Sequence, residues 1–153
     1  MRIIKVQNKE LLAKKATELF VNVIKNNESP ILGLATGSTP ERMYELLIEK
    51  YKNGEICFAN VLAFNLDECV GLAPNHPASY RYYMQQKLYN HVNTEKTNTF
   101  LPNGLAIDLE QECNMYEQQI KQTGNIDFLV LGIGENGHIG FNEPGTSFNA
   151  RIS

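Results

Sequence analysis

Apolar and polar positions alternate along the chain in two different patterns. Short apolar runs predict strands at 2–6, 29–35, 60–66, 97–102 and 126–134. Between these runs, apolar residues recur every three or four positions and predict helices at 8–26, 40–52, 79–91 and 108–122. The two patterns follow one another almost without interruption, so a strand is expected before and after most helices.

Strands separated by helices of this length favour parallel βαβ crossovers. We therefore predict an α/β fold, a Rossmann-like parallel sheet with helices on both faces, formed by a single domain over residues 1–153. The first helix should bury one row of residues, namely Leu12, Ala16, Leu19 and Val23.

Helix boundaries can also be predicted from local chemistry. Asp108 and Gln111 have the spacing of a capping box at the start of the last helix, and Gly124 is a typical helix stop. Ser38 and Glu41 have the same capping-box spacing before the second helix.

Composition and charge exclude several classes of protein. The 153 residues carry a net charge of −3 without any block of like charges, which argues against binding to nucleic acid or to an anionic membrane. No apolar run approaches the roughly 20 residues that span a bilayer, and the N-terminus does not resemble a signal peptide. Cys57, Cys69 and Cys113 are odd in number and lack CxxC spacing, which argues against structural zinc or a disulfide framework and fits a reducing cytoplasm.

Ligands of open parallel sheets bind at the carboxyl ends of strands, and three polar clusters follow predicted strands. The first is "ATGSTPER" at 35–42. Gly37 permits close approach of the backbone to a ligand, Ser38 and Thr39 offer hydroxyls, and the start of the following helix favours an anion such as phosphate. A capped turn without any ligand explains the same residues equally well.

The second cluster is "FNLDECVGL" at 64–72. Asp67 and Glu68 are adjacent at a strand end, so their side chains should diverge, one toward a cleft and the other into structural contacts. A carboxylate in a dry cleft can act as a general base once its pKa is adjusted. An acidic pair that only caps backbone groups is the alternative.

The third cluster, "LVLGIGENGHIGFNEPG" at 129–145, holds the only histidine that lies in a glycine-rich strand-end loop. Glu143 lies five residues after His138 and could orient and polarise its imidazole, while Asn136 could hydrogen-bond to either group. A satisfied loop histidine beside a surface glutamate is the alternative. The glycine density favours a ligand, because it lets the backbone follow one closely.

Together the clusters predict a cleft with a phosphate site, a carboxylate base and a histidine. The substrate they favour is a small phosphorylated metabolite that undergoes proton transfer. No GxGxxG follows the first strand, and neither a Ser-His-Asp signature nor a metal-ligand cluster is present, so neither a cofactor nor a metal is expected.

Three motifs, "LGLATGSTP", "FNLDE" with the following "HPASY", and "LGIGENGHIGFNEPG", together resemble the glucosamine-6-phosphate deaminase (isomerase) family. The similarity runs from Met1 to about Arg151. It implies a cytoplasmic enzyme of amino-sugar (N-acetylglucosamine, N-acetylneuraminate) catabolism, monomeric or homo-oligomeric. Such an enzyme converts D-glucosamine 6-phosphate and water to D-fructose 6-phosphate and ammonia without a cofactor.

The resemblance also implies roles for individual residues. His138 would drive opening of the pyranose ring, assisted by Glu143 and Asn136. Asp67 would move a proton between C2 and C1 through an enolamine. The substrate phosphate would lie on the loop formed by Thr36, Gly37, Ser38 and Thr39.

Two positions depart from the family pattern. Many members have Asp where this chain has Asn136, and Asn cannot relay charge, so Glu143 is the expected partner of His138. Cys69 stands where Tyr is common. Family chains also continue well past Ser153, and the remainder normally supplies further strands, a mobile lid and the Arg and Lys that hold phosphate. We therefore expect the N-terminal portion of the family domain, without its C-terminal part.

Two other functions compete with the deaminase. A non-catalytic sugar-phosphate sensor, as used in transcriptional repressors, would keep the phosphate loop but need not keep both Asp67 and the His138–Glu143 pair. A 6-phosphogluconolactonase-like hydrolase would carry a glycine-rich GH loop but neither FNLDE nor FNEP. The joint presence of these features favours the deaminase.

Overall fold

A four-stranded parallel sheet forms the centre of the computed structural model, which describes residues 3–147. Its strands are β1 (Ile31–Leu34), β2 (Leu62–Asn65), β3 (Thr99–Phe100) and β4 (Phe128–Leu129), in the spatial order β3-β2-β1-β4. The helices are α1 (Lys9–Asn26), α2 (Glu41–Lys52), α3 (Tyr80–Lys87) and α4 (Leu109–Thr123), with 3₁₀ turns at Tyr89–His91 and Lys96–Asn98. All three strand pairs are parallel, which confirms the predicted α/β class.

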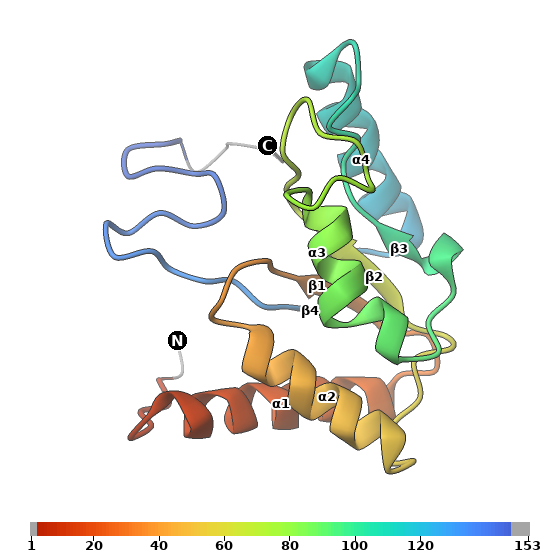
Figure 1. Ribbon diagram of the computed structural model, residues 1–153, viewed down its shortest axis with the longest axis vertical. Coiled ribbons are helices and arrows are strands. Elements are labelled where there is room, and N and C mark those ends of the chain that lie inside the picture. The colour runs from red at the N-terminus through yellow and green to blue at the C-terminus, as the bar shows by residue number, and fades with distance from the viewer. Residues whose placement is uncertain (1–2, 148–153) are drawn as a thin grey trace.

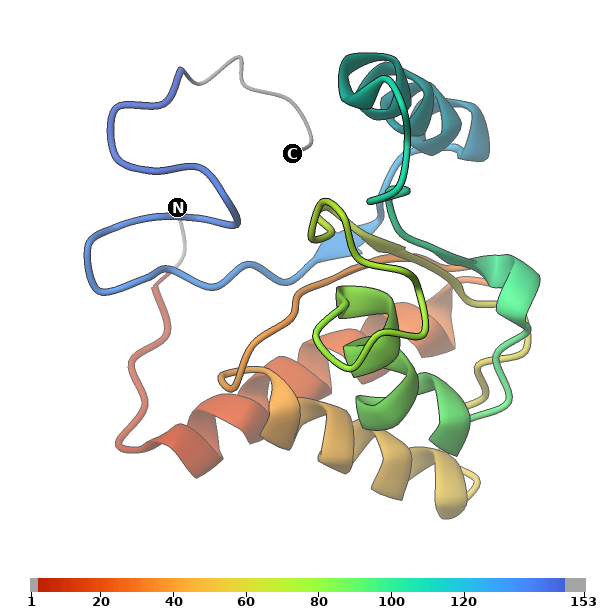
Figure 2. The ribbon, with the colours of Figure 1, turned by 45° about the horizontal axis from the view of Figure 1, so that its top comes forward.

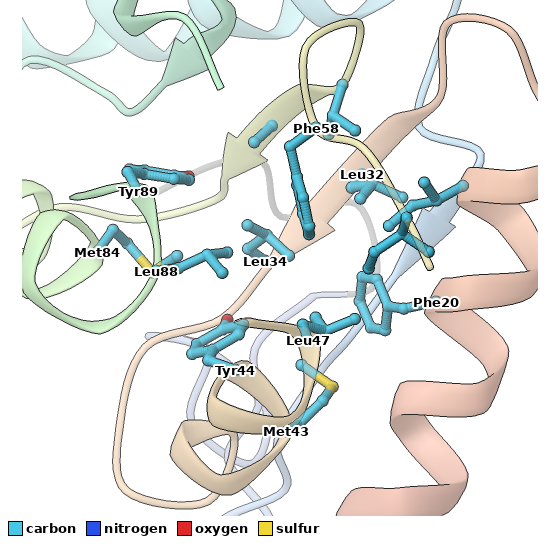
Figure 3. Packing of buried hydrophobic residues seen from close by; sticks show 14 of the residues in the cluster. Phe20, Leu32, Leu34, Met43, Tyr44, Leu47, Phe58, Met84, Leu88 and Tyr89 are labelled. Carbon is cyan, nitrogen blue, oxygen red and sulfur yellow. The ribbon is translucent and has the colours of Figure 1, made fainter. Parts of the chain in front are cut away.

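Helices cover both faces of the sheet (Figures 1 and 2). On one face α1, α2 and α3 enclose the larger core, in which Phe20, Leu34, Tyr44 and Leu47 are buried (Figure 3). On the other face α4 packs through Tyr116 against Ile31 and Phe64. The two cores hold the sheet between them, so the loops at its carboxyl end start from fixed strands.

The predicted strand at 2–6 is wrong over its described part, because residues 3–6 form no strand and are exposed. Arg2 lies outside the described residues. A strand needs a neighbour to pair with, and residues 3–6 pair with none of the four strands of the sheet.

The predicted buried row of α1 is wrong at Leu12 and Leu19, which remain 47% and 38% exposed, while Ala16 and Val23 are partly buried against the core. The fully buried residues of the helix are Ala13, Thr17, Phe20 and Ile24. Phe20 decides the rotation of the helix, because its ring packs edge-on against Phe128 of β4 at a centroid distance of 4.9 Å.

Helix ends follow local chemistry in one case and not in the other. The Asp108 carboxylate accepts a hydrogen bond from the Gln111 N–H, and Gly124 ends α4 with a φ of +119°, as predicted. The capping box from Ser38 and Glu41 is wrong, because the N-cap of α2 is Pro40, which provides no side-chain cap.

The final strand is shorter than predicted. β4 pairs with β1 only through Phe128 and Leu129, and one further bond joins the Val130 N–H to the Gly33 carbonyl. Leu131 and Ile133 then lie 49% and 76% exposed, and the chain runs away from the sheet beyond them (Figure 2). None of the described helices is long and apolar enough to cross a membrane.

Candidate functional site

One cavity of about 760 Å³ lies at the carboxyl ends of β1, β2 and β4. The strand order leaves β1 between β2 and β4, which is a topological switch point where ligands bind in open parallel sheets. Thr36, Gly37, Thr39, Asp67 and His138 all line it, so the structure brings the three strand-end clusters together. Ser38, Asn136 and Glu143 are not part of the lining.

The loop after β1 is tied down by two tyrosines that the sequence analysis did not single out. The Tyr44 hydroxyl donates to the Ala35 carbonyl at 2.5 Å and accepts from the Ala35 N–H at 3.2 Å. The Tyr83 hydroxyl donates to the Gly37 carbonyl at 2.6 Å. Gly37 has a φ of +103°, a conformation that disfavours other residues. The loop that was predicted to bind phosphate is thus held in place before any ligand arrives.

Asp67 and Glu68 divide their roles as the sequence analysis expected of such a pair. Glu68 is buried, and its carboxylate accepts from the N–H groups of Cys69, Tyr80 and Arg81 at 2.8, 2.7 and 2.9 Å. It therefore caps the first turn of α3. Asp67 has no such bonds among those of the described residues and lines the cavity.

The environment of Asp67 suits a proton acceptor. Burial raises the pKa of this carboxyl group above its ordinary value, and the neighbouring charge of Glu68 raises it further. A carboxylate with a raised pKa holds an abstracted proton more readily than a solvated one does.

Asn136 is the direct partner of the His138 ring, and the prediction of Glu143 in that place is wrong. The Asn136 Oδ1 lies 2.6 Å from His138 Nδ1, and the Asn136 Nδ2 donates to a Glu143 carboxylate oxygen at 2.8 Å. The amide stands between the two because it offers an acceptor on one side and a donor on the other.

Two glycines explain why the third cluster has so little bulk. A Cβ at Gly134 would overlap with the imidazole ring of His138, so this ring lies directly on the glycine backbone. A Cβ at Gly140, whose φ is +59°, would lie 3.4 Å from Asp67 Oδ2. The loop after β4 thereby approaches Asp67 closely.

Tyr80 joins the clusters and was not predicted as a site residue. It lines the cavity, its hydroxyl interacts with Thr36, and its ring stacks on Phe141 with centroids 5.8 Å apart. Burial raises the pKa of the Tyr80 hydroxyl, so the group stays protonated. The available signal was the position of both aromatics inside the motifs that carry the family resemblance.

The described lining of the cavity combines negatively charged and apolar side chains and lacks positively charged ones. Among the described residues it contains the carboxylates Asp67 and Glu117 but neither Lys nor Arg. The guanidinium of Arg42 instead bonds to Glu10 and Glu45. Much of the remaining lining is apolar: Leu12, Ala16, Met43, Leu131 and Ile133. No group of three His, Cys, Asp or Glu within residues 3–147 is placed to hold a metal ion.

Known proteins resemble this chain in sequence and in fold. It is 53% identical over 151 residues to a glucosamine-6-phosphate deaminase of Thermoanaerobacter sp. (strain X514), covering 99% of this chain and 60% of the relative. A solved monomeric glucosamine-6-phosphate deaminase superposes with a TM-score of 0.95 at 43% identity, over 98% of this chain and 62% of the other.

A more distant structure, 6-phosphogluconolactonase from Thermotoga maritima, superposes with a TM-score of 0.73 at 19% identity over 92% of this chain and 62% of that one. At that identity the likeness concerns the fold alone. The chain spans about 60% of the length of the curated relatives that it matches. The sequence profile described as glucosamine-6-phosphate isomerases/6-phosphogluconolactonase matches residues 7–141. The resemblance of the motifs is therefore confirmed, and the chain belongs to the glucosamine-6-phosphate isomerase/6-phosphogluconolactonase family.

Proposed function

We propose that this protein converts D-glucosamine 6-phosphate and water to D-fructose 6-phosphate and ammonia. The observation that carries the proposal is the common cavity of Asp67, His138 and the 36–39 loop. The deaminases among the relatives support this chemistry over lactone hydrolysis, because the similar lactonase structure shares the fold at only 19% identity.

Ring opening is the first step. His138 takes the proton from the anomeric hydroxyl and returns a proton to the ring oxygen as the bond between C1 and that oxygen breaks. The product is an open-chain aldehyde with the amino group still on C2. Asn136 and Glu143 serve this step by orienting the imidazole.

Isomerisation and deamination follow. Asp67 removes the proton from C2 as the C2 ammonium passes a proton to O1, which gives an enolamine; Asp67 then delivers its proton to C1, which leaves an iminium at C2. Water adds to C2, ammonia leaves, and the ketone of fructose 6-phosphate remains. The raised pKa of Asp67 fits a group that must both accept and return this proton.

The phosphate would lie on the loop of Thr36, Gly37, Ser38 and Thr39, near the start of α2. Within the described lining it would meet hydroxyls and backbone N–H groups without a cationic side chain. Charge-assisted hydrogen bonds are roughly twice as strong as neutral ones. We therefore infer that tight binding needs the cations that the family places in its C-terminal part.

The partners and the compartment follow from the same proposal. The chain would act on a small sugar phosphate, with neither nucleic acid nor membrane, in the cytoplasm. The free cysteines at positions 57, 69 and 113 suit a reducing compartment. The solved relative is described as monomeric, which favours a monomer over a homo-oligomer for the extended chain.

Ammonia release from glucosamine 6-phosphate tests the proposal, run beside hydrolysis of 6-phosphogluconolactone. The assay uses both the 153-residue chain and the same chain extended by the C-terminal two-fifths of the Thermoanaerobacter relative. The extended chain should release ammonia, and the shorter one little or none.

Two variants of the extended chain separate the roles. Asp67→Asn should abolish turnover with substrate binding largely kept, because the phosphate loop is unchanged. His138→Gln should slow the reaction most with closed-ring substrate. An extended chain that binds the sugar phosphate without turning it over would indicate the sensor function, and lactone hydrolysis would indicate the lactonase.

A further inference from the structure

Asn65, the last residue of β2, is a completely buried polar residue at the carboxyl end of the sheet. Its Nδ2 donates to the Leu34 carbonyl at 2.9 Å, and its Oδ1 accepts from the Tyr89 hydroxyl at 3.2 Å. Its backbone carbonyl accepts from the Tyr116 hydroxyl at 2.8 Å. Burial raises the pKa of both tyrosines, so both hydroxyls stay protonated and can donate.

The two tyrosines reach Asn65 from opposite faces of the sheet. Tyr89 belongs to the larger core, which α1, α2 and α3 enclose, and Tyr116 of α4 belongs to the smaller core. A buried amide or carbonyl that loses its partner costs the protein the free energy of its desolvation. Each hydroxyl therefore stabilises the observed position of Asn65, and the end of β2 is fixed from both sides.

The side-chain amide of Asn65 takes the place of the next backbone bond between β1 and β2. The Leu62 N–H donates to the Pro30 carbonyl at 2.9 Å, and from there the strands stay in register up to the pair of Leu34 and Asn65. In a parallel ladder such bonds recur every two residues, so continued pairing would bring the Leu66 N–H to the Leu34 carbonyl. No hydrogen bond within residues 3–147 joins these two groups, and the amide occupies the carbonyl instead.

The cavity opens where this pairing stops. Leu34 and Ala35 line it from the side of β1, and Leu66 and Asp67 line it from the side of β2. The bond between Asn65 and Leu34 joins the two strands immediately before this opening. Because Asp67 follows two residues after Asn65, the point at which the chain leaves the sheet determines where the Asp67 carboxylate can lie.

We propose that Asn65 is a positioning residue for Asp67. Its side chain ends the pairing of β2 with β1, so that the chain leaves the sheet at Leu66 and Asp67 reaches the cavity. Asn65 acts through the backbone, because it is not itself among the residues that line the cavity. The use of Asp67 as the proton acceptor rests on the proposed function. The placement of its carboxylate does not, because it follows from the hydrogen bonds of Asn65.

A ¹³C titration of the Asp67 carboxyl group in the 153-residue chain tests this placement without any substrate. The signal is assigned by its loss in Asp67→Asn. In the unchanged chain the pKa should lie above the ordinary 3.8, because the carboxyl group is largely buried. Asn65→Ala removes the amide, and Tyr89→Phe removes only the donor to its Oδ1. Both should let water reach Asp67 and lower its pKa toward 3.8, and Asn65→Ala should do so more strongly.

Tyr51→Phe is the matched control, because the Tyr51 ring packs against the same core and its hydroxyl makes no hydrogen bond within residues 3–147. It should leave the pKa of Asp67 unchanged. Circular dichroism establishes that each variant is folded, and if Asn65→Ala is not, Tyr89→Phe decides. An Asp67 pKa at the ordinary value in the unchanged chain, or one that stays raised in every folded variant at Asn65 and Tyr89, would overturn the proposal.

Kinetics of the chain extended by the C-terminal part of the Thermoanaerobacter relative form the second arm. Asn65→Ala should lower kcat for ammonia release by about 10- to 100-fold, because a small displacement of a reacting group costs this much, while KM stays within about 3-fold. A kcat equal to that of the unchanged extended chain would also refute the positioning role. If the extended chain releases no ammonia at all, the proposed function fails, and the titration still decides the role of Asn65.

Discussion

Replacing Glu68 should cost the fold far more than its single carboxylate suggests. The carboxylate accepts three backbone N–H bonds of 2.7 to 2.9 Å and is 6% exposed. A hydrogen bond to a charged group contributes about 1.5–3 kcal/mol, and donors left without a partner inside the protein cost more than donors facing water. Because the three bonds share one side chain, their contributions do not simply add. For Glu68→Ala we expect a loss of about 3–5 kcal/mol, a large part of the 5–15 kcal/mol typical of a domain.

Glu68→Gln separates charge from shape. It keeps one oxygen, so the bonds to Cys69 and Tyr80 at Oε1 can persist, while the Arg81 N–H at Oε2 loses its acceptor. The expected loss is about 1.5–3 kcal/mol.

The assay is urea unfolding followed by far-UV circular dichroism, since the chain has no tryptophan. Glu28→Gln, at an exposed position before β1, is the control and should stay within about 0.5 kcal/mol of the unchanged chain. If Glu68→Ala unfolded within about 1 kcal/mol of the unchanged chain, this carboxylate would not be what holds the start of α3.

Three further outcomes are expected. Burial raises the pKa of Asp67, so the ionised carboxylate opposes folding at neutral pH. Asp67→Asn should therefore be more stable than the unchanged chain at pH 7. The urea midpoints of the two chains should converge as the pH falls through the raised pKa to below the ordinary value of 3.8. Gly134→Ala should displace the His138 ring and lower ammonia release by the extended chain, whereas Gly132→Ala, where a Cβ meets nothing within 4 Å, should leave ammonia release unchanged. The outer edge of β4 has no strand partner within residues 3–147, and Leu131 beside it is 49% exposed. The 153-residue chain should therefore self-associate in sedimentation velocity, and Leu131→Lys should reduce this association. A monomer at every concentration would contradict the role of this edge.

The sequence by itself determined the kinds and order of the elements. Hydrophobic periodicity is a local property, and it identified the four strands and four α-helices described from residue 8 onward, although β4 is shorter than predicted. The cap at Asp108 and the stop at Gly124 were equally local, because each needs only the residues of one helix end. Even the placing of Asp67 and His138 after strands needed no more than the element order.

Only the tertiary structure decided which partner each of these groups meets. The rotation of α1 depends on Phe128, more than a hundred residues away, and periodicity could not choose between the rows of Leu12 and Ala13. Glu68 rather than Asp67 accepts the first N–H groups of α3 because the helix begins beside it, while Ser79 is its N-cap residue. Asn136 came between His138 and Glu143 because the glycine loop folds back on itself, and a hydrogen bond depends on positions within a few tenths of an ångström that residue spacing does not encode.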